Sequence, residues 1–162
     1  MQTHYQTDPG KVRSHNEDSV TIVKNLSGDY LLMVADGMGG HKAGEVASNI
    51  AIEHVRDSFE ELETLGKKED AIDYLRRIVK EINEKIFSYT KNHPESKGMG
   101  TTLVIAIKTN DYILYGNIGD SSGYVMKNGL LHKITKDHTL VNLLVSTGEL
   151  TPEQAKFHPR KN

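Results

Sequence analysis

Hydrophobic and polar residues follow a strand-like pattern in several short runs of this chain. Residues 19–25 and 29–36 form two runs rich in β-branched and apolar residues, and a short Leu-Ser-Gly turn separates them. This arrangement predicts an antiparallel hairpin. A second hairpin is expected from residues 101–108 and 111–120. A third is expected around the Asn-Gly pair at 128–129, which favours a two-residue turn.

Two segments between these strands have the period of an amphipathic helix. Apolar residues recur every three or four positions in residues 43–59 and, more regularly, in residues 69–91. The tail adds one short helical pattern and a helix start at Thr151-Pro152, because proline is favoured in the first turn. The order of hairpin, two helices and two hairpins predicts an α+β fold in which helices pack on antiparallel sheet.

Composition narrows the classes of protein that this chain can represent. Its 162 residues suit one domain, and 36% hydrophobic with 26% charged residues is typical of a folded globular protein. A formal net charge of −2 predicts no nucleic-acid partner. The absence of cysteine excludes disulfides, thiol nucleophiles and thiolate-bound metals. No apolar run reaches the roughly 18 residues that span a bilayer, and the start lacks a signal-peptide pattern, so we expect a cytoplasmic protein without a membrane partner.

Two aspartates stand at the ends of apolar strands, each beside a glycine. Asp36 ends the second predicted strand before Gly37, and Asp120 follows Gly119 at the end of the fourth. A carboxylate is costly to bury unless it is paired or bound to a cation. If the two strands are adjacent, both carboxylates can meet at one site for a hard divalent metal. Either aspartate alone can instead start a turn by accepting backbone N–H groups.

A polar stretch before the first predicted strand contains further candidates. Glu17 and Asp18 can add carboxylate or water-mediated ligands to a divalent metal. Arg13 can hold a phosphate group through two parallel hydrogen bonds. Taken alone, this stretch is more simply a solvated loop.

The glycine-rich loop after Asp36 matches neither common phosphate-binding fingerprint. Its sequence GMGGHKAG has the spacing of neither the P-loop nor the dinucleotide fingerprint, and Lys42 has no Ser or Thr after it. Nucleotide binding is therefore not expected, and the glycines instead allow backbone to approach a metal or substrate. His41 is the one histidine that we consider for proton transfer, with a plain surface position as the alternative.

Taken in order, five short motifs resemble those of one enzyme family. RSHNED, VADGMGGHKAGEVAS, MGTTL, NIGDSSGY and ITKDHTLV are similar to successive motifs of the metal-dependent protein serine/threonine phosphatases, the PP2C or PPM family, in their bacterial form. The resemblance covers nearly the whole chain. It implies a central antiparallel β-sandwich flanked by helices. It also implies two core Mn²⁺ or Mg²⁺ ions at one end, and a third ion in the bacterial members.

The resemblance also implies which residues serve the metals. Asp36 matches the aspartate that bridges the two core ions, and Gly37 matches the residue that offers its backbone carbonyl. Glu17 and Asp18 match acids that support the cluster, largely through bound water. Asp120 matches the acid associated with the third ion.

The family reaction is hydrolysis of phosphoserine and phosphothreonine by direct attack of a metal-activated water. Arg13 matches the arginine that binds the substrate phosphate, so Asp36 and Arg13 are the expected catalytic residues. The partners that this implies are phosphorylated proteins and a bacterial serine/threonine kinase whose action the enzyme reverses.

The chain departs from the family pattern at three places. Ser122 replaces the arginine of the family's GDSR motif, and Met38 stands where eukaryotic members have a histidine proposed as general acid. The leaving-group proton would then come from water or from His41. Residues 145–158 resemble the mobile flap, and the DGL-like and DN-like motifs that follow it in the family are not found here. We therefore expect residues 1–162 to be the N-terminal part of a single phosphatase domain, with an incomplete metal site.

Two hypotheses follow. The leading one is a protein phosphatase that is active in its complete form. The alternative is a non-catalytic binding or regulatory fragment of such a phosphatase. The expected sheet also keeps an open edge, which proteins usually cover or pair. A dimer or a partner segment would cover it.

Overall fold

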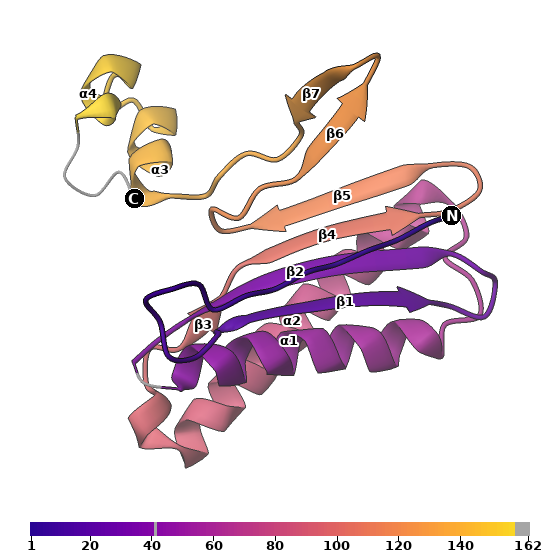
Figure 1. Ribbon diagram of the computed structural model, residues 1–162, viewed down its shortest axis with the longest axis horizontal. Coiled ribbons are helices and arrows are strands. Elements are labelled where there is room, and N and C mark those ends of the chain that lie inside the picture. Colours follow the sequence, from indigo (N-terminus) through magenta and orange to yellow (C-terminus); the bar gives the residue numbers. More distant parts are fainter. Residues whose placement is uncertain (41, 158–162) are drawn as a thin grey trace.

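The computed structural model describes residues 1–40 and 42–157, and its central feature is a five-stranded antiparallel sheet. The order of hydrogen-bonded strands is β1-β2-β4-β5, and the short β3 pairs with the end of β2. Figure 1 shows the four longer strands side by side. The bounds of the strands are β1 (Asp18–Lys24), β2 (Tyr30–Met38), β3 (Gly100–Thr101), β4 (Leu103–Lys108) and β5 (Ile113–Ile118).

The two predicted hairpins that build this sheet are confirmed. β1 and β2 pair from Asp18 opposite Asp36 to Lys24 opposite Tyr30. β4 and β5 also pair with each other directly, and β4 pairs on its other side with β2. Buried and exposed residues alternate along most of β2, as expected for a sheet that is packed on one face.

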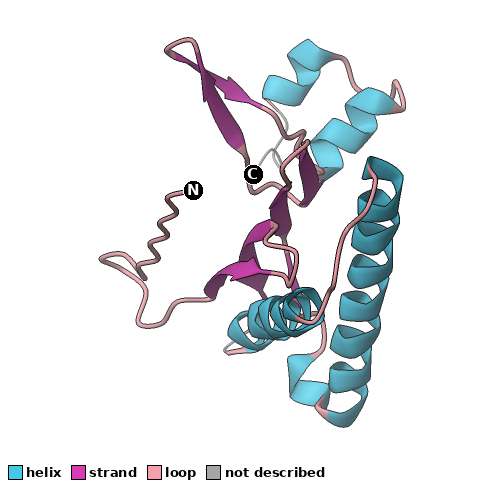
Figure 2. Cartoon of the chain, turned by 90° about the vertical axis from the view of Figure 1, so that its right-hand side faces the viewer, coloured by secondary structure: helices cyan, strands magenta, loops and turns pink. Residues whose placement is uncertain are grey.

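Two helices cover one face of the sheet at the positions that the sequence pattern predicts. They are α1 (Ala43–Glu60) and α2 (Lys68–Asn92), and Figure 2 shows both on the same side of the strands. Their apolar faces meet the inward side chains of β2 and β4 in one core. The largest fully buried apolar side chains in this core are Phe59, Ile78, Leu31, Met33, Ile107 and Val55.

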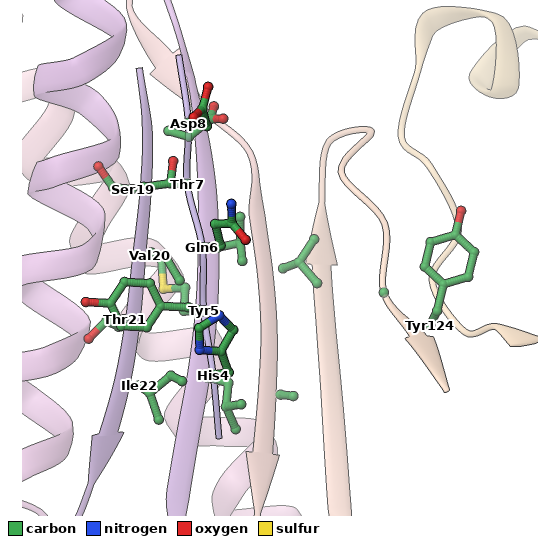
Figure 3. A pocket seen from close by; sticks show the side chains of 17 residues that line it. His4, Tyr5, Gln6, Thr7, Asp8, Ser19, Val20, Thr21, Ile22 and Tyr124 are labelled. Carbon is green, nitrogen blue, oxygen red and sulfur yellow. The ribbon is translucent and has the colours of Figure 1, made fainter. Parts of the chain in front are cut away.

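An extended N-terminal segment lies along the opposite face of the sheet (Figure 1). Residues 4–8, together with β1, β2 and β4, line a groove of about 560 Å³. Figure 3 shows the side chains of this segment beside β1, with Tyr124 at the far side of the groove. The two faces of the sheet therefore differ, because one is packed against helices and the other is hollowed along its length.

The last part of the described chain contains a separate hairpin, β6 (Tyr124–Lys127) and β7 (Leu130–Lys133), which confirms the third predicted hairpin. Asn128 and Gly129 have positive φ values of 53° and 77°, and two such residues form the tight turn that the Asn-Gly pair predicts. Within residues 1–40 and 42–157, this hairpin forms its own two-stranded sheet.

Three short helices complete the secondary structure. The one-turn 3-10 helix η1 (Pro94–Ser96) follows α2, while α3 (Leu140–Ser146) and α4 (Pro152–Lys156) follow the hairpin. The predicted start at Thr151 is confirmed, since its hydroxyl accepts a hydrogen bond from the Gln154 N–H at 3.2 Å. In the part of the chain that is described, no helix is long and apolar enough to cross a membrane.

The flap and the covered sheet edge stay predictions. The flap expected at residues 145–158 includes the end of α3 and all of α4, while residue 158 lies outside the described residues. β1 and β5 are the edge strands of the sheet formed by the described residues. A dimer or a partner segment that covers one of these edges is therefore still an expectation.

A cluster of charged side chains joins the outer surfaces of the two long helices. His54 of α1 lies 2.8 Å from the Glu81 carboxylate of α2, and Arg77 lies 2.9 Å from the same carboxylate. The hydrogen bonds from His54 and then from Arg77 hold the pKa of Glu81 below its usual range. A lowered pKa means that ionised Glu81 stabilises the fold above the pKa of the unfolded chain, about 4.3. This stabilisation is lost as the pH falls through the lower, folded-state pKa.

We predict that Glu81→Gln lowers the free energy of unfolding by about 0.5–1 kcal/mol at neutral pH, because the charge-assisted contacts are lost. The difference from the unsubstituted protein should shrink as the pH falls below about 4. Urea unfolding across this pH range measures it. Glu84→Gln is the matched control on α2, since Glu84 makes only an exposed contact at 3.8 Å with Lys80. A loss of stability that is the same at every pH would contradict the prediction.

Candidate metal centre

Three aspartates lie at one end of the sheet. Asp18 begins β1 and stands opposite Asp36, near the end of β2, while Asp120 follows β5. The strands that lead to Asp36 and Asp120 are not adjacent, as the sequence argument for a shared site supposed, because β4 lies between β2 and β5. Both strands are antiparallel to β4 and hence parallel to each other. Their C-terminal ends therefore lie at the same end of the sheet. Asp120 is close enough there to act electrostatically on Asp36.

The carboxyl group of Asp36 lies where its charge is disfavoured. Loss of hydration around the carboxyl raises its pKa, and the charge of Asp18 and a hydrogen bond with it raise the pKa further. Asp120 acts in the same direction, and the Arg13 guanidinium lowers the pKa. The excess of negative charge around Asp36 is therefore only partly balanced by the protein itself.

This raised pKa has a defined consequence for stability. Below the pKa of an unfolded aspartate, about 3.9, Asp36 is protonated in both states and its titration has no effect. As the pH rises from there through the higher folded-state pKa, ionisation of Asp36 increasingly reduces stability, and the full loss is present above that pKa. A cation that binds the cluster favours the ionised form and removes this loss.

Thr102 connects the ends of the strands that carry the aspartates. Its backbone N–H donates to the Asp36 carbonyl oxygen at 2.9 Å, and its hydroxyl accepts from the Asp36 N–H at 3.0 Å. The same hydroxyl lies 2.7 Å from the hydroxyl of Ser121, the residue after Asp120. This role could not be predicted from the sequence, because a threonine before a strand gives no signal of long-range hydrogen bonding.

The first turn of α1 packs directly on the backbone at the end of β2. A Cβ atom at Gly37 would overlap the carbonyl oxygen of Gly44, and one at Gly44 would lie 2.8 Å from the carbonyl carbon of Gly37. Only glycine allows this approach at both positions. The Gly37 N–H donates to the Glu17 carbonyl oxygen at 3.1 Å, and the buried Ser48 hydroxyl of α1 lies 2.7 Å from that oxygen. The contact joins β2, α1 and the segment before β1.

The other predicted site residues differ in their exposure and in their contacts. Glu17 contributes its backbone carbonyl to the contact just described, and its carboxyl group lies against Gly44. Arg13 is exposed, and the ion pairs found within residues 1–40 and 42–157 do not include it. Met38 is exposed at the end of β2. His41 lies outside the described residues.

The side chains at this edge fit a hard divalent cation. Carboxylate oxygens are the ligands that Mg²⁺ and Mn²⁺ prefer, and Asp18, Asp36 and Asp120 supply them at this end of the sheet. Within the described residues, no three acidic or histidine side chains converge closely enough to form a ready-made metal site. An ion held here therefore needs water or further protein ligands to complete its coordination.

Comparison with known proteins identifies the family. A family model described as protein phosphatase 2C matches residues 10–160. The chain belongs to the protein phosphatase 2C family. Over 162 residues it is 41% identical to the serine/threonine phosphatase stp of Listeria monocytogenes, covering 100% of this chain and 64% of that protein. The chain therefore spans just under two thirds of the length of this relative, and the resemblance to PP2C phosphatases is confirmed.

Solved structures of PP2C-type phosphatases have the same fold. Stp1 from Staphylococcus aureus superposes with a TM-score of 0.84 and 42% identity, covering 96% of this chain and 61% of that one. The catalytic domain of PstP, solved with two manganese ions, superposes with a TM-score of 0.76 and 39% identity, covering 93% and 61%. These likenesses confirm the predicted PP2C-like fold with antiparallel sheets and helices. Of the predicted β-sandwich, the described residues form one five-stranded sheet and a separate two-stranded hairpin.

We predict that Gly44→Ala lowers the free energy of unfolding by about 1–3 kcal/mol, because the added methyl group pushes α1 away from β2. In an ordinary helix position the same substitution stabilises by about 1 kcal/mol. Gly40→Ala is the matched control, since a Cβ atom there would meet nothing within 4 Å. Chemical unfolding of both variants measures the effect. Equal stability of the two variants would contradict the close contact.

Proposed function

We propose that this protein is a metal-dependent protein serine/threonine phosphatase that hydrolyses phosphoserine and phosphothreonine. The observation that carries this proposal is the group of Asp18, Asp36 and Asp120 at one end of the sheet, where the Arg13 guanidinium is close enough to lower the pKa of Asp36. Membership of the PP2C family supports it. So does the naming of the relatives as serine/threonine phosphatases.

In this proposal Asp18, Asp36 and Asp120 form an acidic edge at the end of the sheet. This acidic edge would hold two divalent ions, and a third ion could bind beside it. Asp36 and the backbone carbonyl of Gly37 would hold the core ions, and Asp120 would serve the third ion. Asp18 and Glu17 support the cluster through water. Manganese or magnesium is the expected metal, and the two manganese ions in the related PstP structure support this choice.

The residues of this chain have distinct tasks in the proposed reaction. When bound, the metal ions supply an acidified water as nucleophile and neutralise charge on the phosphoryl oxygens. Arg13, an exposed residue whose charge acts on Asp36, binds the phosphate through parallel N–H groups and orients it. Met38 has no proton to donate, so solvent water or His41 protonates the leaving serine or threonine oxygen. No covalent enzyme intermediate is required.

The proposed substrates are phosphorylated proteins, and a serine/threonine kinase pathway is the proposed source of them. We place this activity in the cytoplasm. A non-catalytic binding or regulatory role for this chain is the second candidate. It is favoured by the finding that no three potential ligand side chains converge among the described residues.

Hydrolysis of a phosphoserine peptide by the chain, followed as phosphate release during a Mn²⁺ titration, tests the proposal. We predict metal-dependent release that falls at least about 100-fold in Asp36→Asn and about 10- to 100-fold in Arg13→Ala. Asp111→Asn, at the opposite end of β5, is the control and should keep full activity. Release that persists in EDTA, or that Asp36→Asn leaves unchanged, would contradict the mechanism. No release at any Mn²⁺ concentration would favour the non-catalytic role.

A further inference from the structure

A second groove, of about 660 Å³, lies between α2 and β3 beside the candidate metal centre. Its floor is apolar, because Ile82 and Ile86 of α2 and Leu103 of β4 are buried there. Its rim carries two large apolar side chains, Phe87 and Met38, which are 60% and 62% exposed. Neighbouring exposed apolar groups beside a groove are typical of a surface that binds a partner.

The charged residues that line this groove are all basic. They are Arg76, Lys80 and Lys97. Arg76 contacts Asp73 at 3.2 Å and Lys80 contacts Glu84 at 3.8 Å, both on the exposed surface of α2. Such exposed pairs contribute about 0–1 kcal/mol, so a carboxylate of a ligand can compete for the cations. The lining therefore complements a ligand that combines apolar and acidic side chains.

The groove and the candidate metal centre share a wall. Met38 pairs with Gly100 in the β2–β3 register, and both residues line the groove. Thr101 also lines it, and the Thr101 hydroxyl donates to the Asp36 carbonyl oxygen at 3.1 Å. Met38 is two residues beyond Asp36, a separation of about 7 Å along an extended strand. A peptide bound at Asp36 therefore reaches the groove within a few residues.

We propose that this groove binds the segment of a phosphoprotein substrate that flanks the phosphorylated residue, and that it selects apolar and acidic side chains in that segment. The proposal rests on the proposed phosphatase function. Phe87 provides the apolar contact, and Lys80 and Lys97 contact the acidic side chains. A small phosphate ester has no flanking segment and does not use the groove.

Peptide binding tests this proposal without relying on turnover. The probes are fluorescein-labelled phosphoserine peptides with leucine and glutamate residues on the N-terminal or the C-terminal flank. A matched peptide carries alanine and lysine there, and each peptide is also made without the phosphate. Fluorescence anisotropy gives the Kd of each peptide for the chain in Mn²⁺ and for each variant. Circular dichroism establishes that the variants are folded.

We expect the Leu/Glu peptide to bind more tightly than the Ala/Lys peptide on one of the two flanks. Phe87→Ser should raise the Kd of the Leu/Glu peptide about tenfold, as loss of a large apolar contact does. Lys97→Glu should weaken it through charge reversal. The controls are Lys24→Glu at the far end of β1 and Leu26→Ser just beyond it. Leu26 is 72% exposed. These controls should leave every Kd unchanged.

The two proposals fail in different ways in this experiment. If the phosphate tightens binding but Phe87→Ser has no effect, the docking groove is overturned and the phosphatase proposal stands. If the Leu/Glu peptide needs Phe87 but gains nothing from its phosphate, docking stands and the phosphatase proposal loses its support. Equal binding of the Leu/Glu and Ala/Lys peptides, or no binding of either, overturns the docking proposal.

Discussion

The close contact between Gly37 and Gly44 is the constraint on which the rest of this end of the molecule depends. It brings the first turn of α1 onto the end of β2, and the carbonyl of Glu17 adds the segment before β1 through hydrogen bonds from Gly37 and Ser48. No side chain fits between these backbones. The strand that carries Asp36 is therefore held on its helical side by main-chain contacts, and the carboxylates project from a rigid edge.

The electrostatic character of this edge follows from the strand order. β1 places Asp18 directly opposite Asp36, and the parallel direction of β2 and β5 brings Asp120 to the same end. Thr102 holds the start of β4 between them through its hydrogen bonds to Asp36. The fold thus concentrates like charges that reduce its own stability at neutral pH, which is the arrangement expected where a cation completes the structure.

The sequence predicts the local features of this protein better than the long-range ones. Hairpins and helices can be predicted from periodicity and turn chemistry. The two long helices and the turn at Asn128 are therefore found where they are predicted. The site residues are predicted from the family resemblance and from the position of acidic residues at strand ends. The insertion of β4 between β2 and β5 and the bridging role of Thr102 depend on pairing between distant segments. A single sequence carries no signal for such pairing.

Thermal unfolding of the unsubstituted chain and of Asp36→Asn, each in EDTA and in excess Mn²⁺ at neutral pH, tests the central claim most directly. The account predicts that Asp36→Asn unfolds at a higher temperature than the unsubstituted chain in EDTA, because the disfavoured charge is gone. It predicts the opposite order in Mn²⁺, because only the unsubstituted cluster binds the ion fully and gains stability from it. If Asp36→Asn were the less stable protein in both solutions, or if Mn²⁺ raised both unfolding temperatures equally, the acidic edge would not be a cation site.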